Sequence, residues 1–162
     1  MRAALPDVHD PSEKARARRD AGLTHFDEGR FQDALGEFEA ATDIDMNFAE
    51  AYGWASAALV KLGRLEEAMR AVDHAIWLDQ FYAWGWNRKG VVFHAMGDFG
   101  GAATCFRKAL EADPGLQAAR ENLRRVEPLI GVNAAIVNFG AEKQEPYRVE
   151  AKGAPKKGRK GQ

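Results

Sequence analysis

The sequence predicts an all-α protein built from three similar helical hairpins stacked side by side. Two observations lead to this prediction. In the stretch Ala83–Pro114, apolar and small residues recur every three or four positions, which places them on one face of each of two short helices. The same pattern occurs 34 and 68 residues earlier, without insertions. Such a period is typical of helical arrays, in which each hairpin completes its core by stacking on its neighbours.

The third hairpin carries the pattern most clearly. Trp86, Gly90 and Phe93 share a face of its first helix. Gly97 is expected to end that helix, because glycine adopts the left-handed conformation without steric cost. Asp98 is suited to cap the second helix. The face of this second helix that meets the first one combines small and aromatic side chains, namely Ala102, Phe106 and Ala109.

The two earlier hairpins carry related residues at the same positions. Gly63 and Gly29 stand where the third hairpin has Gly97, so each first helix is expected to end in the same way. Ser56 and Gly22 correspond to Gly90. A helix start is expected at residues 10–13, with a cap, a proline in the first turn and then an acid. The six hairpin helices are expected at about 10–28, 31–43, 49–62, 65–78, 83–96 and 99–112.

These residues resemble the tetratricopeptide repeat family over roughly Ala15–Leu116. The third repeat matches nearly the whole family motif, with Trp86, Gly90, Phe93, Ala102, Phe106, Ala109 and Pro114. The other two repeats depart from it: Ser56 and Gln80 replace the usual glycine and proline, and His25 and Met46 replace an aromatic residue and a proline. The resemblance implies a right-handed superhelical array of repeats at about 15–48, 49–82 and 83–116.

The rest of the chain is assigned around this array. Residues 1–9 are expected to be disordered, and the repeat domain to cover 10–130, including a capping helix at 116–127. Leu116, Ala119, Leu123 and Val126 share the apolar face of that helix, which Pro128 and Gly131 are expected to end. The apolar segment 132–139 fits a strand, a helical turn or an extended segment. Residues 131–162 are expected to be a flexible tail, basic from residue 152.

Composition is ordinary for one soluble domain of 162 residues, with a formal net charge of −1. The last eleven residues contain no acid, so residues 1–151 carry a net charge of −6. The basic residues of this tail are Lys152, Lys156, Lys157, Arg159 and Lys160. No signal peptide or membrane span is apparent, and a cytoplasmic location is expected. The single cysteine, Cys105, excludes an internal disulfide and is expected to be buried.

The sequence contains no constellation of catalytic residues. Its four histidines show no metal-ligand spacing with one another or with Cys105, and no glycine motif for phosphate is present. Acidic pairs such as Glu66 and Glu67 lie in the first turns of helices, where the helix dipole explains them. We therefore predict a protein that is not an enzyme and that has no cofactor and no metal site.

The resemblance implies a binding site, because in tetratricopeptide proteins the first helices line a concave groove that holds a partner peptide. Aromatic and arginine side chains, which dominate binding hot spots, are present on the corresponding faces here. An alternative is that Trp54 and Trp84 only pack between neighbouring hairpins. The predicted groove residues are Arg16, Arg19, Leu23, Phe26, Glu50, Trp54, Lys61, Trp84, Asn87, Arg88, Val91 and His94.

One branch of the family binds the C-terminal carboxylate of chaperone peptides through a clamp of lysine, arginine and asparagine. Here Arg19 and Arg88 occupy two clamp positions, but Leu23, Trp54 and Trp84 occupy the other three. The clamp is broken, so we do not predict that ligand. The predicted function is non-catalytic binding of a partner protein or extended peptide, as an adaptor, scaffold or chaperone.

Two alternatives accompany this prediction. Length and repeat number also resemble the bacterial secretion chaperones that hold an extended partner segment, although this chain lacks their long N-terminal helical extension. A different class of function is association with nucleic acid or an anionic surface, since the basic residues of the tail, 152–160, are able to neutralise phosphates.

Overall fold

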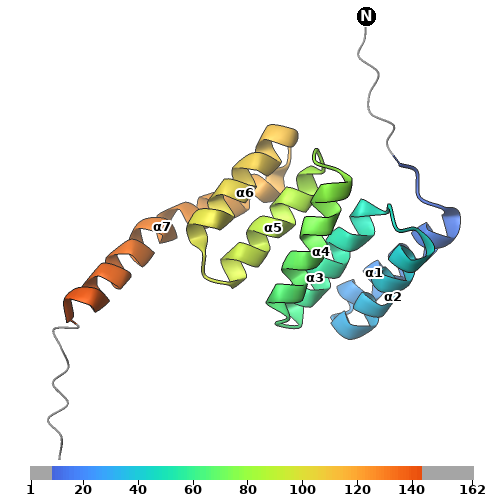
Figure 1. Ribbon diagram of the computed structural model, residues 1–162, viewed down its shortest axis with the longest axis horizontal. Coiled ribbons are helices and arrows are strands. Elements are labelled where there is room, and N and C mark those ends of the chain that lie inside the picture. Colours follow the sequence, from blue (N-terminus) through green and yellow to red (C-terminus); the bar gives the residue numbers. More distant parts are fainter. Residues whose placement is uncertain (1–8, 144–162) are drawn as a thin grey trace, which may run out of the picture. The chain divides into compact units, whose positions relative to one another are not determined.

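The computed structural model describes residues 9–143, with side chains to residue 131, and these residues form seven α-helices and no strand (Figure 1). The chain divides into two units, residues 1–130 and 131–162. The helices are α1 (Glu13–Asp27), α2 (Phe31–Ile44), α3 (Ala49–Lys61), α4 (Leu65–Leu78), α5 (Ala83–Ala95), α6 (Phe99–Ala112) and α7 (Gln117–Lys143). The all-α repeat array predicted from the sequence is confirmed.

The hairpins stack in chain order within the first unit. Each odd-numbered helix up to α5 packs against the helix that follows it, and α2 and α4 pack against the first helix of the next hairpin (Figure 1). A direct contact between α3 and α5 joins the first helices of two hairpins. Side chains from α3 and α5 can therefore meet, and this contact positions the candidate site.

In the first and third hairpins, the two helices are packed together where a glycine lies against an aromatic ring. Gly22 of α1 lies against Phe38 of α2, and Gly90 of α5 lies against Phe106 of α6, so closely that a Cβ atom on either glycine would overlap the ring. Both rings are almost completely buried. The small residue is therefore required because it lets the two helices approach at the ring.

The middle hairpin solves the same packing problem with different residues. Val72 replaces the phenylalanine, and Ser56 replaces the glycine; both are fully buried. The Ser56 hydroxyl donates a hydrogen bond of 2.8 Å to the carbonyl oxygen of Ala68, so the buried polar group is paired. In this hairpin a smaller residue, Val72, is thus combined with a larger one, Ser56, so the space between the two helices is still filled.

The turns inside the hairpins agree with the sequence prediction. Gly29, Gly63 and Gly97 adopt φ angles of 74°, 75° and 82°, and they are the described residues with positive φ. A side chain at any of them would be strained in this left-handed region.

The N-terminal helix begins later than the sequence suggested. Ser12, rather than Asp10, is the cap of α1, and its hydroxyl accepts a hydrogen bond of 3.3 Å from the backbone N–H of Ala15. Disorder expected for residues 1–9 does not extend to His9, whose ring nitrogen Nε2 lies 2.8 Å from the Asp45 carboxylate. Residues 1–8 lie outside the described part of the chain.

The last helix differs most from the prediction. Its apolar face packs as expected, since Leu123 and Val126 contact the core residues of α6. However, α7 does not end near residue 127 but continues through Pro128 and Gly131 to Lys143. A proline inside a helix removes one backbone hydrogen bond and bends the helix without necessarily ending it. Of the three conformations considered for 132–139, the backbone is helical; the basic tail from residue 152 lies outside the described residues.

The contact between glycine and ring predicts the stability of two alanine variants. Gly90→Ala should lower the free energy of unfolding by about 1–3 kcal/mol, because its Cβ atom overlaps the ring of Phe106. Gly36→Ala is the matched control in α2, where a Cβ atom would meet no other atom within 4 Å, and it should raise stability by up to about 1 kcal/mol. Urea unfolding followed by circular dichroism measures both. Equal stability of the two variants would contradict this packing.

Candidate functional site

The structure brings four of the chain's polar and aromatic side chains together where α3 meets α5. The guanidinium of Arg88 lies over the ring of Trp54, 4.1 Å from its centroid, and 5.5 Å from the ring centroid of Trp84. Its Nη1 atom donates a hydrogen bond of 2.6 Å to the hydroxyl oxygen of Tyr82, which precedes α5. These four residues are called the Arg88 cluster below.

Two glycines make room for this cluster. A Cβ atom on Gly53 would lie 3.2 Å from both Arg88 Nη1 and Tyr82 Oη, and one on Gly85 would lie 2.7 Å from Tyr82 Cδ1. Both glycines are in helices, where glycine is unfavourable by about 1 kcal/mol relative to alanine. Their presence at these positions is explained by the approach of Tyr82 and Arg88.

Arg88 is a buried cation without a carboxylate partner among the described side chains. The residue is 7% exposed, and no acidic oxygen lies within 4 Å of it among the described side chains. Contact with aromatic faces and the hydrogen bond to Tyr82 compensate part of its lost hydration. Burial raises the pKa of the Tyr82 hydroxyl and the Arg88 cation partly offsets that effect, so Tyr82 is neutral near pH 7.

The other arginines predicted in the groove are neutralised within the chain. Arg19 donates from Nε to the Asp20 carboxylate and from Nη1 to the Glu50 carboxylate, and each of these distances is 2.7 Å. Arg16 forms an ion pair of 2.5 Å with Asp10. Arg88 therefore differs from both in having no charge partner among the described residues.

The two tryptophans of the cluster have different environments. Trp54 packs edge-on against Phe26, with ring centroids 5.6 Å apart, and stacks near Phe38 at 6.2 Å, so it joins the first two hairpins as the packing alternative proposed. Trp84 is 45% exposed and presents a large apolar surface to solvent. The alternative of packing alone thus describes Trp54 better than Trp84.

The remaining predicted residues are spread between core and solvent. Asn87 is 5% exposed, and its Oδ1 atom accepts a hydrogen bond of 3.1 Å from Asn122 of α7, so it takes part in packing instead of facing a ligand. Leu23 and Val91 lie half-buried against core clusters. Lys61 and His94 are exposed next to aromatic rings, those of Phe31 and Phe99.

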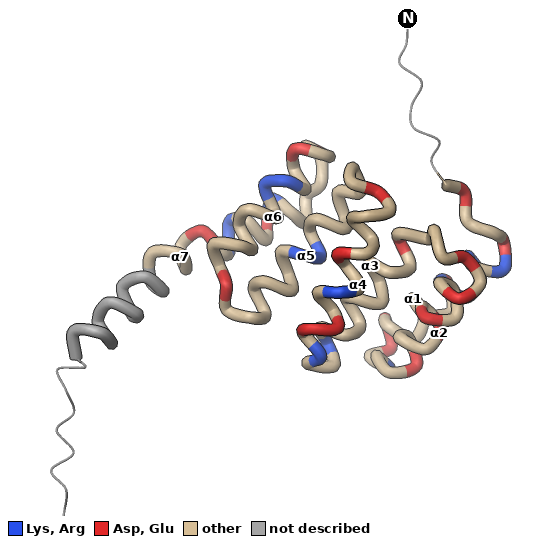
Figure 2. The backbone as a smooth tube through the Cα atoms, in the orientation of Figure 1, with Lys and Arg blue, Asp and Glu red and all other residues tan. Residues whose placement is uncertain are grey.

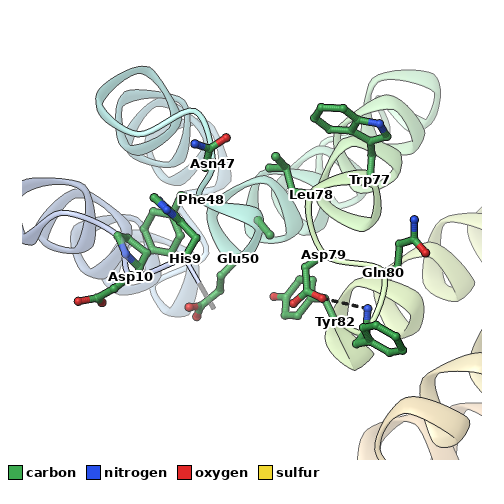
Figure 3. Close-up of a pocket in the computed structure, with 13 residues that line it drawn as sticks. His9, Asp10, Asn47, Phe48, Glu50, Trp77, Leu78, Asp79, Gln80 and Tyr82 are labelled. Atoms are coloured by element: carbon green, nitrogen blue, oxygen red, sulfur yellow. Dashed lines mark hydrogen bonds between the residues drawn. The ribbon is translucent and has the colours of Figure 1, made fainter. Parts of the chain in front are cut away.

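The structure also places residues at the surface that sequence reasoning did not select. Trp77 and Phe81 are 73% and 77% exposed. Both line a pocket of about 650 Å³ beside the loops that connect the hairpins (Figure 3). A usable signal was that Phe81 lies in the connection between α4 and α5, outside any helical pattern.

Catalytic and metal chemistry find no support in the described residues. Cys105 is 4% exposed, as expected, and burial raises the pKa of its thiol. No group of three or more histidine, cysteine or acidic side chains suited to a metal ion occurs within residues 9–131. None of the helices in the described ranges is long and apolar enough to cross a membrane.

Comparison with known proteins agrees with this architecture. Family models of the tetratricopeptide repeat match residues 25–80 and 83–116, and the chain belongs to this family. Hsp70-Hsp90 organizing protein 2 of Arabidopsis thaliana is 29% identical over 107 residues, which are 66% of this chain and 19% of that protein. The chain thus spans about a fifth of the length of such curated relatives.

Solved structures show the same fold. The second tetratricopeptide domain of human RPAP3, determined in complex with the HSP70 peptide SGPTIEEVD, has a TM-score of 0.63 and 25% identity, covering 70% of this chain and 95% of that one. The Sgt2 tetratricopeptide domain from Aspergillus fumigatus has a TM-score of 0.72 and 22% identity, covering 93% and 98%.

The different environments of the two tryptophans predict different effects on stability. Trp54→Ala should lower the free energy of unfolding by about 3 kcal/mol, because it removes contacts with core side chains of two neighbouring hairpins. Trp84→Ala should lower it by about 1 kcal/mol or less, since nearly half of this side chain is exposed and no core cluster of the described residues includes it. Thermal and urea unfolding of both variants test this. A larger loss for Trp84→Ala would show that it is a core residue.

Proposed function

We propose that this chain is a non-catalytic interaction module that binds an extended peptide of a partner protein along the face formed by α1, α3 and α5. The observation that carries the proposal is the Arg88 cluster, where an exposed tryptophan covers a cation that lacks a carboxylate partner among the described residues. Exposed aromatic and arginine side chains at one point are typical of binding hot spots.

The cluster favours an anionic group next to an apolar side chain. A guanidinium has five N–H donors, and in the described part of the chain Tyr82 accepts from Arg88 at Nη1. The other nitrogen atoms of Arg88 are not among the fully buried, unpaired polar atoms of the described residues, so they retain some contact with solvent. A carboxylate that reached them would gain a charge-assisted hydrogen bond in a poorly hydrated site.

The proposed ligand differs from one held by a carboxylate clamp. Arg19, at another clamp position, is already paired with Asp20 and Glu50. Leu23 and Trp54 provide apolar surface where a clamp requires polar groups. An acidic side chain within the peptide, beside an apolar residue that packs on Trp84, therefore fits this face better than a free C-terminal carboxylate.

The relatives suggest the setting of such a module. Organizing proteins of Hsp70 and Hsp90 are among the curated matches, and the RPAP3 domain was solved with an acidic HSP70 peptide. A role as an adaptor, scaffold or co-chaperone is consistent with these matches and with the family. We assign no catalytic step to the chain, because the Arg88 cluster offers recognition groups without a nucleophile or a general base.

Binding of the HSP70 peptide SGPTIEEVD, with a free or an amidated C-terminus, tests the proposal. Fluorescence anisotropy should give dissociation constants within about threefold of each other for the two forms, because the clamp that recognises the terminal carboxylate is incomplete. Trp84→Ala and Arg88→Met should each weaken binding at least about tenfold. Methionine is chosen because it keeps an unbranched stem for packing on Trp54 but removes the charge.

Arg70→Gln is the control for charge, since Arg70 is an exposed residue of α4 away from the Arg88 cluster. It should bind like the wild type. Unchanged binding by folded Trp84→Ala and Arg88→Met variants would show that this face is not the site. Loss of binding on amidation alone would show that a terminal carboxylate is recognised after all.

A further inference from the structure

A second recognition surface lies at the edge of the array and shares Tyr82 with the Arg88 cluster. The pocket of about 650 Å³ is formed by residues 9–11, by the connection between α2 and α3, and by the end of α4 with its connection to α5. In Figure 3, His9 and Asp10 lie on one side, Trp77 and Gln80 lie on the other, and Glu50 and Tyr82 lie between them. We call it the loop-edge pocket.

The loop-edge pocket is acidic. Among the described residues, its lining includes Asp10, Glu50 and Asp79 but neither lysine nor arginine. Two of these carboxylates are paired with arginines outside the lining, while Asp79 has no cation within 4 Å among the described side chains and accepts the backbone N–H of Phe81 at 2.9 Å. The part of the chain on one side of the pocket is acidic as well. Residues 9–50 contain eleven acidic and five basic residues, and acidic positions predominate around α1 and α2 in Figure 2.

The same pocket has an exposed aromatic rim. Trp77 and Phe81 are each about three-quarters exposed, which the fold itself does not require. One ring of this rim is supported from within the chain, since His74 lies 5.6 Å from Trp77 and 4.4 Å from Tyr52 between ring centroids. Exposed rings next to carboxylates attract cations, because the face of an aromatic ring carries negative charge.

We propose that the loop-edge pocket binds a basic segment of a partner protein, with a lysine or arginine side chain inserted between the carboxylates and the aromatic rim. Such a side chain has an apolar stem for Trp77 and Phe81 and a charged end for Asp79, whose carboxylate has no cation within 4 Å among the described side chains. The carboxylates do not converge in the manner of a metal site within the described residues. Phosphate-bearing partners are disfavoured by the acidic lining.

This proposal goes beyond the function assigned to the Arg88 cluster, because it concerns a different surface and the opposite ligand charge. It does not depend on that function. Charge complementarity favours the basic segment, and the aromatic rim favours apolar residues on either side of it. The expected ligand is thus a short peptide in which leucine or phenylalanine flanks lysine or arginine.

An array of synthetic peptides tests this with the full chain. Apolar residues flank a lysine or arginine in one set, a glutamine in the second and a glutamate in the third. The wild-type protein should bind the basic set at least about tenfold more tightly than the other two sets. No preference for the basic set would overturn the proposal.

Variants then locate the binding on the pocket. Trp77→Gln and Phe81→Gln change exposed side chains and should each weaken binding of the basic set about tenfold. Asp79→Asn keeps an oxygen that can accept the backbone N–H of Phe81 but removes the charge, and its effect should shrink as salt rises. Unchanged binding in all three folded variants would overturn the proposal.

Asp113→Asn is the matched control. Asp113 stands 34 residues after Asp79 and makes the equivalent turn, accepting the backbone N–H of Gly115 at 2.9 Å, but it does not line the pocket. It should bind the basic set like the wild type. Equal losses in Asp113→Asn and Asp79→Asn would contradict a local site. If a peptide of residues 152–162 binds more tightly than every member of the basic set, the occupant is the chain's own tail and a partner segment is wrong.

Discussion

The arrangement of the whole array depends on how closely the two helices of each hairpin approach. A hairpin of this size cannot bury its apolar surface alone, so its helices must be close enough for the next hairpin to complete the core. In the outer two hairpins this distance depends on a glycine against a phenylalanine ring, as with Gly90 and Phe106. In the middle hairpin it depends on Ser56 and Val72. The spacing of the hairpins sets the contact between α3 and α5, and with it the Arg88 cluster.

The Arg88 cluster shows how such an array creates a binding group from ordinary packing. Burial of an arginine is unfavourable unless its charge is compensated, and here the rings of Trp54 and Trp84 and the Tyr82 hydroxyl surround the Arg88 guanidinium. Gly53 and Gly85 supply the space. The result is a cation fixed in position before any ligand arrives, and a fixed group loses less conformational entropy on binding than a free side chain.

Charge is distributed unevenly between the two surfaces considered. The face with Arg88 keeps a cation without a carboxylate partner among the described residues, whereas the loop-edge pocket keeps acidic groups without lysine or arginine in its lining. Glu50 takes part in both, since it neutralises Arg19 and also lines the pocket. A partner that met both surfaces would have to carry opposite charges in a defined order, and this requirement would increase specificity.

Much of the fold was determined by local features of the sequence. The three-to-four-residue spacing of apolar side chains defines six helices, the glycines at 29, 63 and 97 define their turns, and the period of 34 residues defines the stacking. Each of these depends on backbone geometry and nearest neighbours, which is why the helix limits were predicted to within a residue or two, apart from the start of α1 and the end of α7. Pro128 suggested that α7 ends near residue 127, because proline disfavours a helix. In the structure the residues on both sides of Pro128 are helical and α7 continues through it.

Only the tertiary structure decided which of the predicted groove residues share a site. Asn87 and Arg88 are consecutive and were both predicted to face the groove, yet Asn87 pairs with Asn122 of α7, 35 residues away, and Arg88 is enclosed by Trp54 and Trp84. The pairing of Arg19 with Glu50 and the exposure of Trp77 and Phe81 likewise depend on elements distant in sequence. The periodicity of one helix states which residues face together, but burial and charge pairing are properties of the surfaces that meet after the hairpins have stacked.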